Sequence, residues 1–391
     1  ISNMSRANFQ IIKKDFQTRA RLGVLKTPHG NIQTPAYVFV GTYGKIRHLS
    51  PVDIKKTKTQ VIIANTFHLW EKANEKLLKF GKIPTMTDSG GFQVLSLAFG
   101  DKNGIGKFLT TRGVVSPQVV NSRKNIKITS KGVYFKWNGK TKFLGPELSM
   151  KIQSKIRADI IFAFDHITSP LDDFEYNKKA VELTNSWAQI CLKKHNEDQL
   201  LFGIVQGGIY QELRKKSAKH IGSLPFDGFG IGGSYTKKQI SKILKWVIPY
   251  LPDEKPRHLL GVGKVADIFE AIENGVDTFD CVIPTREARH GRLYTKTGYM
   301  DIRRGAYAND KKVIEKRCGC PTCSSKIPRS KIRELIKSDE PIRQAHGQRW
   351  CLMHNMWFFN NLLEEIRNSI ARGKFLEFKK SYLARFEKTK R

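Results

Sequence analysis

Leu201-Phe202-Gly203-Ile204-Val205, followed at once by Gln206-Gly207-Gly208, is a short apolar run that ends in a polar, glycine-rich turn. A run that is apolar throughout, instead of alternating with polar residues, predicts a strand buried on both faces of a parallel sheet. Helix-like stretches follow this run and two later ones, at Gln211–Ile221, Thr236–Tyr250 and Val265–Asn274. Strands that alternate with helices predict the α/β class.

The same pattern recurs along most of the chain and predicts a closed (β/α)8 TIM barrel. The active site of such a barrel lies at the carboxyl ends of the strands, which is where the polar turns fall. The pattern therefore predicts a fold and the place of its site together. The seven other runs are Tyr37–Val40, Val61–Ala64, Pro84–Thr87, Ile160–Phe164, Phe229–Ile231, Leu259–Leu260 and Val276–Phe279.

The composition indicates a polyanionic partner. The 391 residues include 69 Lys and Arg against 35 Asp and Glu, a formal net charge of +34. Neutralisation of phosphates by Lys and Arg drives nucleic-acid binding, although a basic, highly soluble protein is the plainer alternative. No stretch is apolar for long enough to span a bilayer, and no signal-peptide core is present. Cysteine spacing that suits a metal predicts a reducing, cytoplasmic environment.

Four segments depart from the barrel rhythm. An Asn-Gly pair at Asn138-Gly139 is a strong hairpin signal, and it predicts a lysine-rich β excursion that overhangs the barrel mouth. These lysines are candidates for contact with a polyanion, and a solvated hairpin face is the alternative. We expect a catalytic barrel at residues 1–303 and a metal-binding helical subdomain at residues 304–391. The departures are a β prelude at 9–35 with a turn at Thr27–Asn31, the excursion at Phe99–Pro146 (with strands near Lys107–Val115, Ile126–Ile128, Val133–Trp137 and Lys140–Phe143), a hairpin of Gly291–Thr295 and Gly298–Ile302, and a helical tail from about His354 to Phe386.

A cluster of cysteines predicts a structural zinc site. Cys318-Gly319-Cys320-Pro321-Thr322-Cys323 presents three soft ligands in one tight turn. Tetrahedral Zn²⁺ takes a fourth, and His354 and Cys351 are both candidates, with His346 a weaker one. Four protein ligands leave no open coordination position, so the predicted site is structural instead of catalytic.

Two aspartates at strand ends are candidates for catalysis. Asp88 opens a turn whose glycines permit close approach of a flat ligand, and Phe92 follows it as a possible stacking partner. Asp280 ends the eighth run. Two carboxylates at a barrel mouth suit displacement at a sugar anomeric carbon, since one attacks the carbon while the other exchanges a proton with the leaving group. Arg286 and Arg289 lie close by in sequence, where guanidinium groups suit phosphate. For either Asp alone, a loop cap or salt bridge is the alternative.

Several long motifs in the same order resemble those of tRNA-guanine transglycosylases. They are Thr87–Gln93 (TDSGGFQ), Gly203–Gly208 (GIVQGG), Gly230–Gly233 (GIGG) and Phe279–Arg286 (FDCVIPTR), and the three cysteines with His354 also match the family's zinc site. The resemblance covers the chain from the N-terminal β region to the helical tail. It implies a bacterial-type (β/α)8 enzyme of queuosine biosynthesis that exchanges guanine at the anticodon wobble position of tRNA for a 7-deazaguanine, as a cytoplasmic pentosyltransferase.

The resemblance also implies roles for individual residues. Asp280 would be the nucleophile that attacks C1′ and forms a covalent tRNA ester, and Asp88 the general acid and base. Asp165, Gln206, Gly232 and Gly233 would read the edge of the base, and Phe92 and Leu260 would sandwich its ring. Arg286, Arg289 and Lys264 would contact tRNA. Turn formation for Gln206 and Gly233, and barrel packing for Leu260, are the alternatives.

The sequence departs from the family beside the expected base pocket. Where bacterial members commonly read Leu-Ala-Val-Gly-Glu and Phe-Asp-Glu-Cys, this chain has Ser234–Lys238 and Phe164-Asp165-His166-Ile167. These stretches lie beside the edge of the base and leave its identity open. Chain length favours the bacterial over the archaeal type, so the incoming base is expected to be 7-aminomethyl-7-deazaguanine (preQ1), with queuine as the alternative. The resemblance also implies a homodimer.

Two other functions are alternatives to a tRNA-guanine transglycosylase. One is a non-catalytic tRNA-binding subunit, and the other is a hydrolytic N-glycosidase or a transglycosylase acting on DNA. The first predicts loss of an aspartate or of the Gln206 pocket, and all are present. Three histidines near strand ends, His68, His166 and His290, are expected to be structural.

Overall fold

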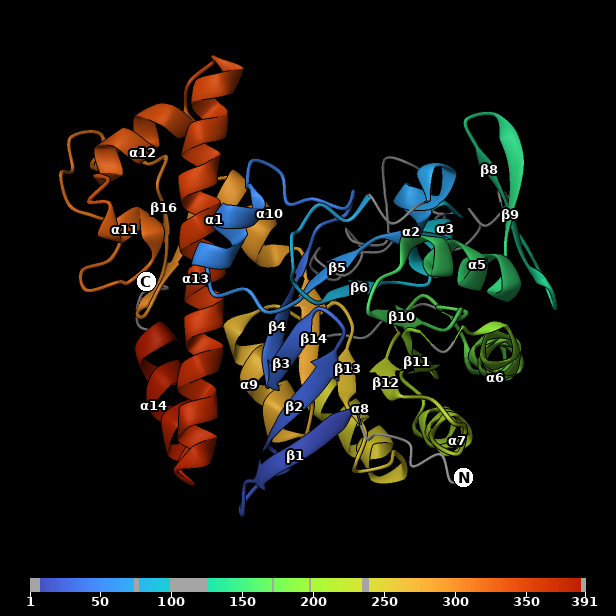
Figure 1. Ribbon diagram of the computed structural model, residues 1–391. Coiled ribbons are helices and arrows are strands. Elements are labelled where there is room, and N and C mark those ends of the chain that lie inside the picture. Colours follow the sequence, from blue (N-terminus) through green and yellow to red (C-terminus); the bar gives the residue numbers. More distant parts are fainter. Residues whose placement is uncertain are drawn as a thin grey trace. The chain divides into compact units, whose positions relative to one another are not determined.

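The computed structural model describes residues 8–73, 77–98, 126–170, 172–196, 198–233 and 239–387 (Figure 1). The expected strand near Lys107–Val115 and the departure at Ser234–Lys238 lie outside these residues. Contacts group the chain into two compact units. One unit contains Ala64–Leu78 and Thr85–Leu260, and the other contains Gln10–Ile63, Lys79–Pro84 and Gly261–Arg391.

Eight strands form a closed barrel, which confirms the predicted α/β class and TIM-barrel architecture. Neighbouring strands are parallel, for example in the register Ile204↔Gly230 and Phe279↔Tyr37. Their side chains are buried on both faces, which is why the runs read as apolar throughout. The order around the barrel is β10 (Ile160–Phe162), β11 (Leu200–Val205), β12 (Gly228–Ile231), β13 (Arg257–Leu259), β14 (Thr278–Cys281), β4 (Ala36–Val40), β5 (Ile62–Ala64) and β6 (Thr85–Thr87).

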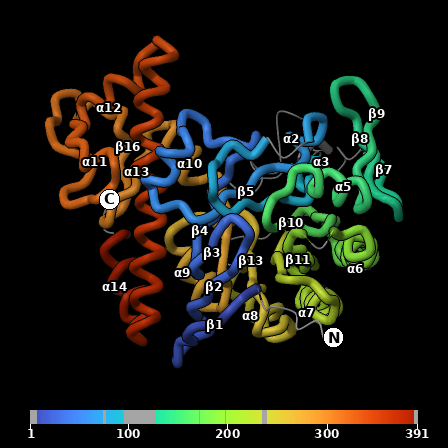
Figure 2. The backbone as a smooth tube through the Cα atoms, viewed as in Figure 1, coloured from blue at the N-terminus to red at the C-terminus, as the bar shows by residue number. Residues whose placement is uncertain are grey.

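Helices between the strands follow the expected positions. The predicted helices at Gln211–Ile221 and Val265–Asn274 are confirmed as α7 (Gln211–Gly222) and α9 (Val265–Glu273). The stretch expected at Thr236–Tyr250 contains α8 (Ile240–Val247) and a 3-10 turn at Ile248–Tyr250. In Figure 2, α6 and α7 lie beside β11. The remaining helices of this part are α1 (Pro51–Lys56), α2 (Thr66–Leu69), the 3-10 helix η1 (Trp70–Lys72), α3 (Gly91–Ala98), α5 (Pro146–Ile156), α6 (Phe174–Lys194) and α10 (Ile283–Arg289).

The N-terminal β prelude is a three-stranded sheet of β1 (Phe9–Lys14), β2 (Arg21–Thr27) and β3 (Gly30–Thr34). The predicted turn at residues 27–31 is confirmed, because β2 and β3 pair up to Thr27↔Gly30. A buried ion pair joins Arg21 in β2 to Asp277, just before β14, with two hydrogen bonds of 2.9 and 2.6 Å. The pair ties this sheet to the strand that carries Asp280.

The described part of the β excursion is a three-stranded antiparallel sheet, which confirms the expected hairpin. Its strands are β7 (Ile126–Thr129), β8 (Gly132–Trp137) and β9 (Lys140–Leu144). Asn138 and Gly139 connect β8 and β9 with φ of +49° and +74°, the left-handed backbone that a tight hairpin turn needs.

The C-terminal region begins with the predicted hairpin, now β15 (Arg292–Thr295) and β16 (Gly298–Asp301). The expected start of the helical tail near His354 is wrong, because α13 runs from Pro341 to Ala371. Pro341 occupies the first turn, where the missing N–H costs no helical hydrogen bond. Gly373, with φ of +67°, separates α13 from α14 (Phe375–Glu387). The 3-10 helix η6 (Gly305–Tyr307), α11 (Pro321–Ser324) and α12 (Arg329–Ile336) lie between β16 and α13.

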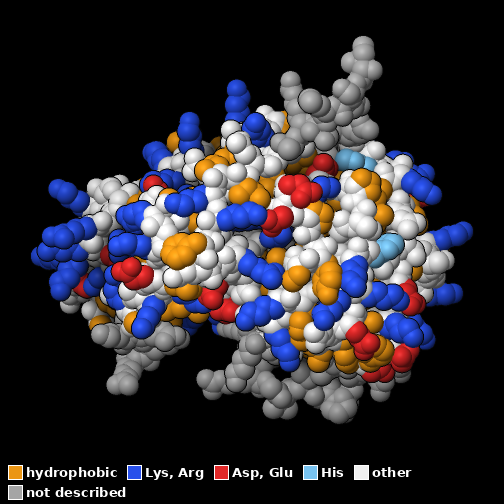
Figure 3. Space-filling model, turned by 90° about the horizontal axis from the view of Figure 1, so that it is seen from below, with side chains coloured by type: hydrophobic (Ala, Val, Ile, Leu, Met, Phe, Trp, Pro, Cys, Tyr) orange, Lys and Arg blue, Asp and Glu red, His pale blue; other side chains and the backbone are white. Residues whose placement is uncertain are grey.

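The surface is strongly basic, as the composition predicts. Lys and Arg side chains are spread across the face shown in Figure 3, where acidic side chains are fewer. Among the described residues, no helix is both long and apolar enough to cross a bilayer.

Candidate active site and metal centre

Asp88 lies at the carboxyl end of β6, and its carboxylate accepts hydrogen bonds from the turns after β5 and β6. Oδ2 accepts from the side-chain amide of Asn65 at 2.5 Å, and Oδ1 accepts from the backbone N–H groups of Thr66 at 3.0 Å and Gly90 at 3.1 Å. Asn65 also caps α2, since its Oδ1 accepts from the backbone N–H of His68. The turn after β5 and the turn after β6 therefore fix the orientation of this carboxylate together.

Asp165 and Gln206 form a buried polar pair beyond the ends of β10 and β11. The Gln206 amide donates to Asp165 Oδ2 at 2.6 Å, and the Ser89 hydroxyl donates to Oδ1 at 3.0 Å. Burial raises the pKa of Asp165 to about 6, and these two hydrogen bonds oppose the rise. The side-chain oxygen of Gln206 is buried and accepts no hydrogen bond from the described part of the chain. It is thus an open acceptor beside a carboxylate whose pKa is raised to about 6.

Gly232 and Gly233 pack closely against Gln206 and the neighbouring Arg214. A Cβ at Gly232 would lie 2.8 Å from the Gln206 amide nitrogen, and a Cβ at Gly233 would lie 2.4 Å from the Arg214 guanidinium. Gly233 also has φ of +110°, which side chains rarely adopt. Arg214, fully buried in α7, donates to the carbonyl oxygens of Gly208 at 2.8 Å and Gly232 at 2.6 Å. One guanidinium therefore holds the turns after β11 and β12.

Phe92 and Leu260 come from two further strand ends. Phe92 is half-buried near the start of α3, four residues after Asp88. Leu260 directly follows β13, and its backbone N–H donates to the carbonyl of Ile231 at 3.2 Å. The five strands β6, β10, β11, β12 and β13 thus each contribute residues from their carboxyl ends, as expected from the sequence.

Asp280 lies within β14 itself, near its carboxyl end, and is partly exposed. Its Oδ1 accepts from the backbone N–H of Gly261 at 3.2 Å. Beside it, the buried Tyr37 hydroxyl donates to the carbonyl of Cys281 at 3.3 Å. Burial and the nearby acidic groups raise the pKa of Tyr37 well above its usual value, so this hydroxyl stays neutral.

Helix α10 follows Asp280 and carries two of the expected phosphate contacts. Arg286 is exposed and Arg289 is half-buried. Burial lowers the pKa of Arg289, and the neighbouring charges of Arg47 and Arg286 lower it further. This concentration of like charge favours an anionic ligand. Lys264 lies elsewhere in the same unit, at the N-cap of α9.

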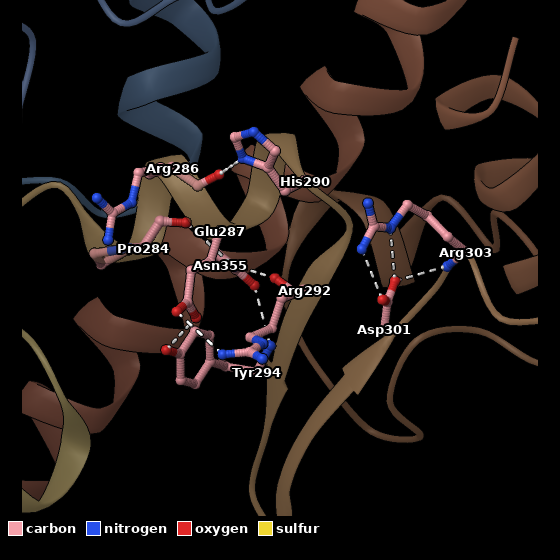
Figure 4. Close-up of polar contacts among 9 residues, drawn as sticks. All are labelled: Pro284, Arg286, Glu287, His290, Arg292, Tyr294, Asp301, Arg303 and Asn355. Atoms are coloured by element: carbon pink, nitrogen blue, oxygen red, sulfur yellow. Dashed lines mark hydrogen bonds and ion pairs between the residues drawn. The ribbon is translucent and has the colours of Figure 1, made fainter. Parts of the chain in front are cut away.

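Asn355 of α13 ties α10 to the β15–β16 hairpin (Figure 4). Its side-chain amide donates to the carbonyls of Pro284 at 3.1 Å and Arg292 at 3.0 Å, and its oxygen accepts from the N–H of Tyr294 at 3.1 Å. The Tyr294 hydroxyl donates to Glu287 at 2.6 Å. The orientation of α10 therefore depends on α13 and β15.

Cys318, Cys320, Cys323 and His354 form a buried cluster whose ligand atoms all lie within 4.8 Å of one another. His354 presents Nδ1 to the sulfur atoms, 3.3 Å from that of Cys320, while its Nε2 donates to the carbonyl of Tyr294 at 2.7 Å. A backbone acceptor on the second ring nitrogen fixes the tautomer that a metal-binding histidine needs. The structure thus selects His354. Cys351, one turn earlier in α13, contributes no ligand atom to this cluster, and neither does His346.

The comparisons with known proteins agree across the whole chain. The family model described as queuine tRNA-ribosyltransferase matches residues 15–388. The chain belongs to this family. It is therefore an enzyme of the pentosyltransferase class.

Similar proteins come from an archaeon and from bacteria. A putative queuine tRNA-ribosyltransferase of Archaeoglobus fulgidus is 41% identical over 394 residues, covering 93% of this chain and 96% of the relative. The queuine tRNA-ribosyltransferases of Halothermothrix orenii and Francisella tularensis subsp. novicida are 36% and 37% identical. Alignments to these two cover 97% and 98% of this chain, and 98% and 100% of the relatives.

Sequence reasoning missed three residues that shape the site of this queuine tRNA-ribosyltransferase family member: Asn65, Ser89 and Arg214. Asn65 directly follows a predicted strand, so its position carried a signal. Arg214 lies on a helix where an arginine normally faces solvent, and nothing in the sequence distinguishes it. The three histidines have structural partners, as expected: His166 Nε2 lies 3.0 Å from the Tyr176 hydroxyl, His290 bonds the carbonyl of Arg286, and the His68 ring packs edge-on against Phe67.

Proposed function

We propose that this protein is a tRNA-guanine transglycosylase that replaces the guanine at the anticodon wobble position with preQ1. The observation that carries the proposal is the pair of aspartates, Asp88 and Asp280, each near the carboxyl end of its own strand in one closed parallel barrel. Carboxylates in such positions suit retaining displacement at an anomeric carbon. Family membership supports tRNA as the substrate.

The proposed reaction has two displacements. An oxygen of the Asp280 carboxylate attacks C1′ of the nucleotide, the C1′–N9 bond breaks, and its electron pair leaves with guanine. Asp88 supplies the proton that guanine takes up. The incoming 7-deazaguanine then loses its N9 proton to Asp88 and attacks C1′, which breaks the ester to Asp280 and restores the original configuration.

The base would bind in the pocket made by the turns after β6, β10, β11, β12 and β13. The Asp165 carboxylate accepts from N–H groups of the base, and the Gln206 side chain and the backbone of Gly232 and Gly233 bind the remaining edge. Phe92 and Leu260 cover the two faces of the ring. Because both glycines lack a side chain, their backbone packs directly against Gln206 and Arg214, which supports its place at the edge of the base pocket.

The tRNA would bind through phosphate contacts of Arg286, Arg289 and Lys264. The target base must leave its stack to reach the pocket, and the free energy of unstacking is offset by such backbone contacts. The cluster of like-charged arginines around Arg289 supports this role. The barrel would extend over residues 1–303, and the subdomain at residues 304–391 would carry the metal. We also propose that the protein acts as a homodimer in the cytoplasm.

Three buried thiols and one imidazole suit zinc better than a hard cation such as Mg²⁺. Cys318, Cys320, Cys323 and His354 would hold Zn²⁺ with no open position. The ion would therefore stabilise the packing around α13 without taking part in base exchange.

The direct test incubates purified protein and unmodified tRNA with radiolabelled guanine, preQ1 and queuine in parallel. Incorporation of guanine and preQ1 into tRNA supports the proposal, whereas preference for queuine would assign the same chemistry to salvage. An equal amount of single-stranded DNA serves as the control nucleic acid. Binding of tRNA without exchange of any base would contradict the proposal and indicate a non-catalytic subunit, and release of free base without replacement would indicate a hydrolase.

A further inference from the structure

The sheet β7–β9 has a basic composition that the proposed chemistry does not use. Residues 126–145 contain five lysines and neither Asp nor Glu. A sheet with positive charge alone attracts polyanions and repels other basic surfaces. The two faces of this sheet differ in how far they are exposed.

One face of the sheet packs inward. Val133, Phe135 and Leu144 are buried, and the Phe135 ring lies 5.8 Å from that of Phe67. A Cβ at Gly90 would lie 3.2 Å from a methyl group of Leu144. The sheet is therefore anchored against the same turn that holds Asp88.

The opposite face presents aromatic rings between lysines. The register Lys127↔Tyr134↔Phe143 places these three side chains on one face, with Lys136 two residues along the same strand. Tyr134 is 42% exposed, and its ring lies 4.8 Å from that of Phe143. Lys127 and Lys136 are exposed and form no ion pair within the described part of the chain. We call Lys127, Tyr134, Lys136 and Phe143 the Tyr134 face.

We propose that the Tyr134 face binds a second, single-stranded segment of the substrate tRNA, with one base stacked on Tyr134 and phosphates at Lys127 and Lys136. Aromatic rings on an exposed sheet, flanked by cations, bind unpaired bases with little regard to sequence. Phe143 directly precedes Leu144 in β9, and successive side chains of a strand point to opposite faces of its sheet, so the Tyr134 face lies on the far side of the sheet from the contact with the Asp88 turn. The sheet thus fixes the position of this face relative to the turn that carries Asp88. The inference rests on the proposed function.

The test compares steady-state guanine exchange into tRNA for Tyr134→Ala, Tyr134→Phe and the double variant Lys127→Glu/Lys136→Glu. Loss of a stacking partner should raise KM for tRNA roughly tenfold with kcat and KM for guanine unchanged, and Tyr134→Phe should stay within about twofold of the parent protein. The double variant should also weaken the salt dependence of tRNA binding, by a log–log slope of roughly 1 to 2. Lys151→Glu/Lys155→Glu, the same total charge change at two exposed positions on α5, is the control and should alter neither.

Two readouts separate this inference from the proposed function. Direct binding of labelled tRNA, followed by fluorescence anisotropy, measures the Tyr134 face whether or not any base is exchanged. If the parent protein exchanges guanine, and KM, affinity and salt slope are the same in Tyr134→Ala and in the double variant, the inference is wrong and the proposed function stands. If the parent protein binds tRNA without exchange, the proposed function fails while the anisotropy series still decides the face.

Discussion

The side-chain amide of Gln206 donates a hydrogen bond to the carboxylate of Asp165 at 2.6 Å, which joins the turns after two adjacent strands into one buried polar pair. Both residues are almost fully buried. The hydrogen bond uses one donor of Gln206 and leaves its oxygen open, so a ligand that enters here meets an acceptor and a carboxylate together. The protonation state of Asp165 then determines which ligand edge fits.

Guanine exchange should lose efficiency in acid as Asp165 takes up a proton. Its pKa is raised to about 6, so the acceptor that the base needs is present above that pH and lost below it. We expect kcat/KM for guanine to fall on the acid side of about pH 6, measured from pH 4.5 to 8.5. Asp165→Asn should remove this acid limb of the pH profile, along with most of the activity. An acid limb that persists unchanged in this variant would assign it to another group.

The raised pKa of Asp165 also predicts how the stability of the protein depends on pH. The folded protein holds the Asp165 proton more tightly than the unfolded chain does, so the free energy of unfolding should decrease as pH rises from about 4 to 6. A shift of this size corresponds to roughly 3 kcal/mol. Denaturant unfolding of the parent protein and of Asp165→Asn across that range measures the difference. Parallel pH profiles for the two proteins would show that this carboxyl does not contribute.

Asp280→Asn should abolish the covalent tRNA adduct, because the amide is too weak a nucleophile to attack C1′. The adduct is measured on denaturing gels after incubation with tRNA. Glu254→Gln, the same carboxylate-to-amide change at an exposed position, is the matched control and should keep the adduct. A persisting adduct in Asp280→Asn would assign the nucleophile elsewhere.

Asp88→Ala should retain tRNA binding and lose base exchange, because the proton has no route to or from the base. Asn65→Ala should reduce kcat by a smaller factor, roughly tenfold, since the carboxylate remains but loses the donor that orients it. Exchange rates and tRNA affinity are measured together for both variants. Full activity in Asp88→Ala would remove this residue from the mechanism.

Asn65→Ala should also cost about 1 kcal/mol of stability through loss of the α2 cap.

Loss of the metal should lower thermal stability without acting at the base-exchange step. Cys320→Ser is expected to lose the bound metal and to shift the unfolding midpoint downward by several degrees or more. Cys351→Ser is the matched control, since this buried cysteine lies on the same helix as His354 but outside the ligand cluster. Metal content by atomic absorption, together with the melting curve, checks both. Equal metal content in the two variants would contradict the assigned ligand set.

The barrel strands could be predicted because burial on both faces leaves a direct mark on the sequence. Tyr37–Val40 and Leu201–Val205 lack the alternation of a half-exposed strand, and each lies in the barrel as expected. The start of α13 could not be placed this way. Its first turns, Pro341–Gln348, contain a single large apolar side chain, Ile342, and so no apolar stripe, which is why only the later part of the helix could be predicted.

The sequence by itself determined the barrel, the polar turns at its strand ends and a thiol cluster with metal spacing, because these features arise between residues close in the chain. Only the tertiary structure chose His354 over Cys351: residues three apart on a helix share a face, so spacing leaves both as candidates, whereas the fold places only His354 among the thiols and the carbonyl of Tyr294 orients its ring. Only the tertiary structure likewise shows that the Asn65 amide donates to the Asp88 carboxylate and that the Arg214 guanidinium donates to the carbonyl of Gly232. A hydrogen bond between distant segments depends on their packing, which no local pattern records.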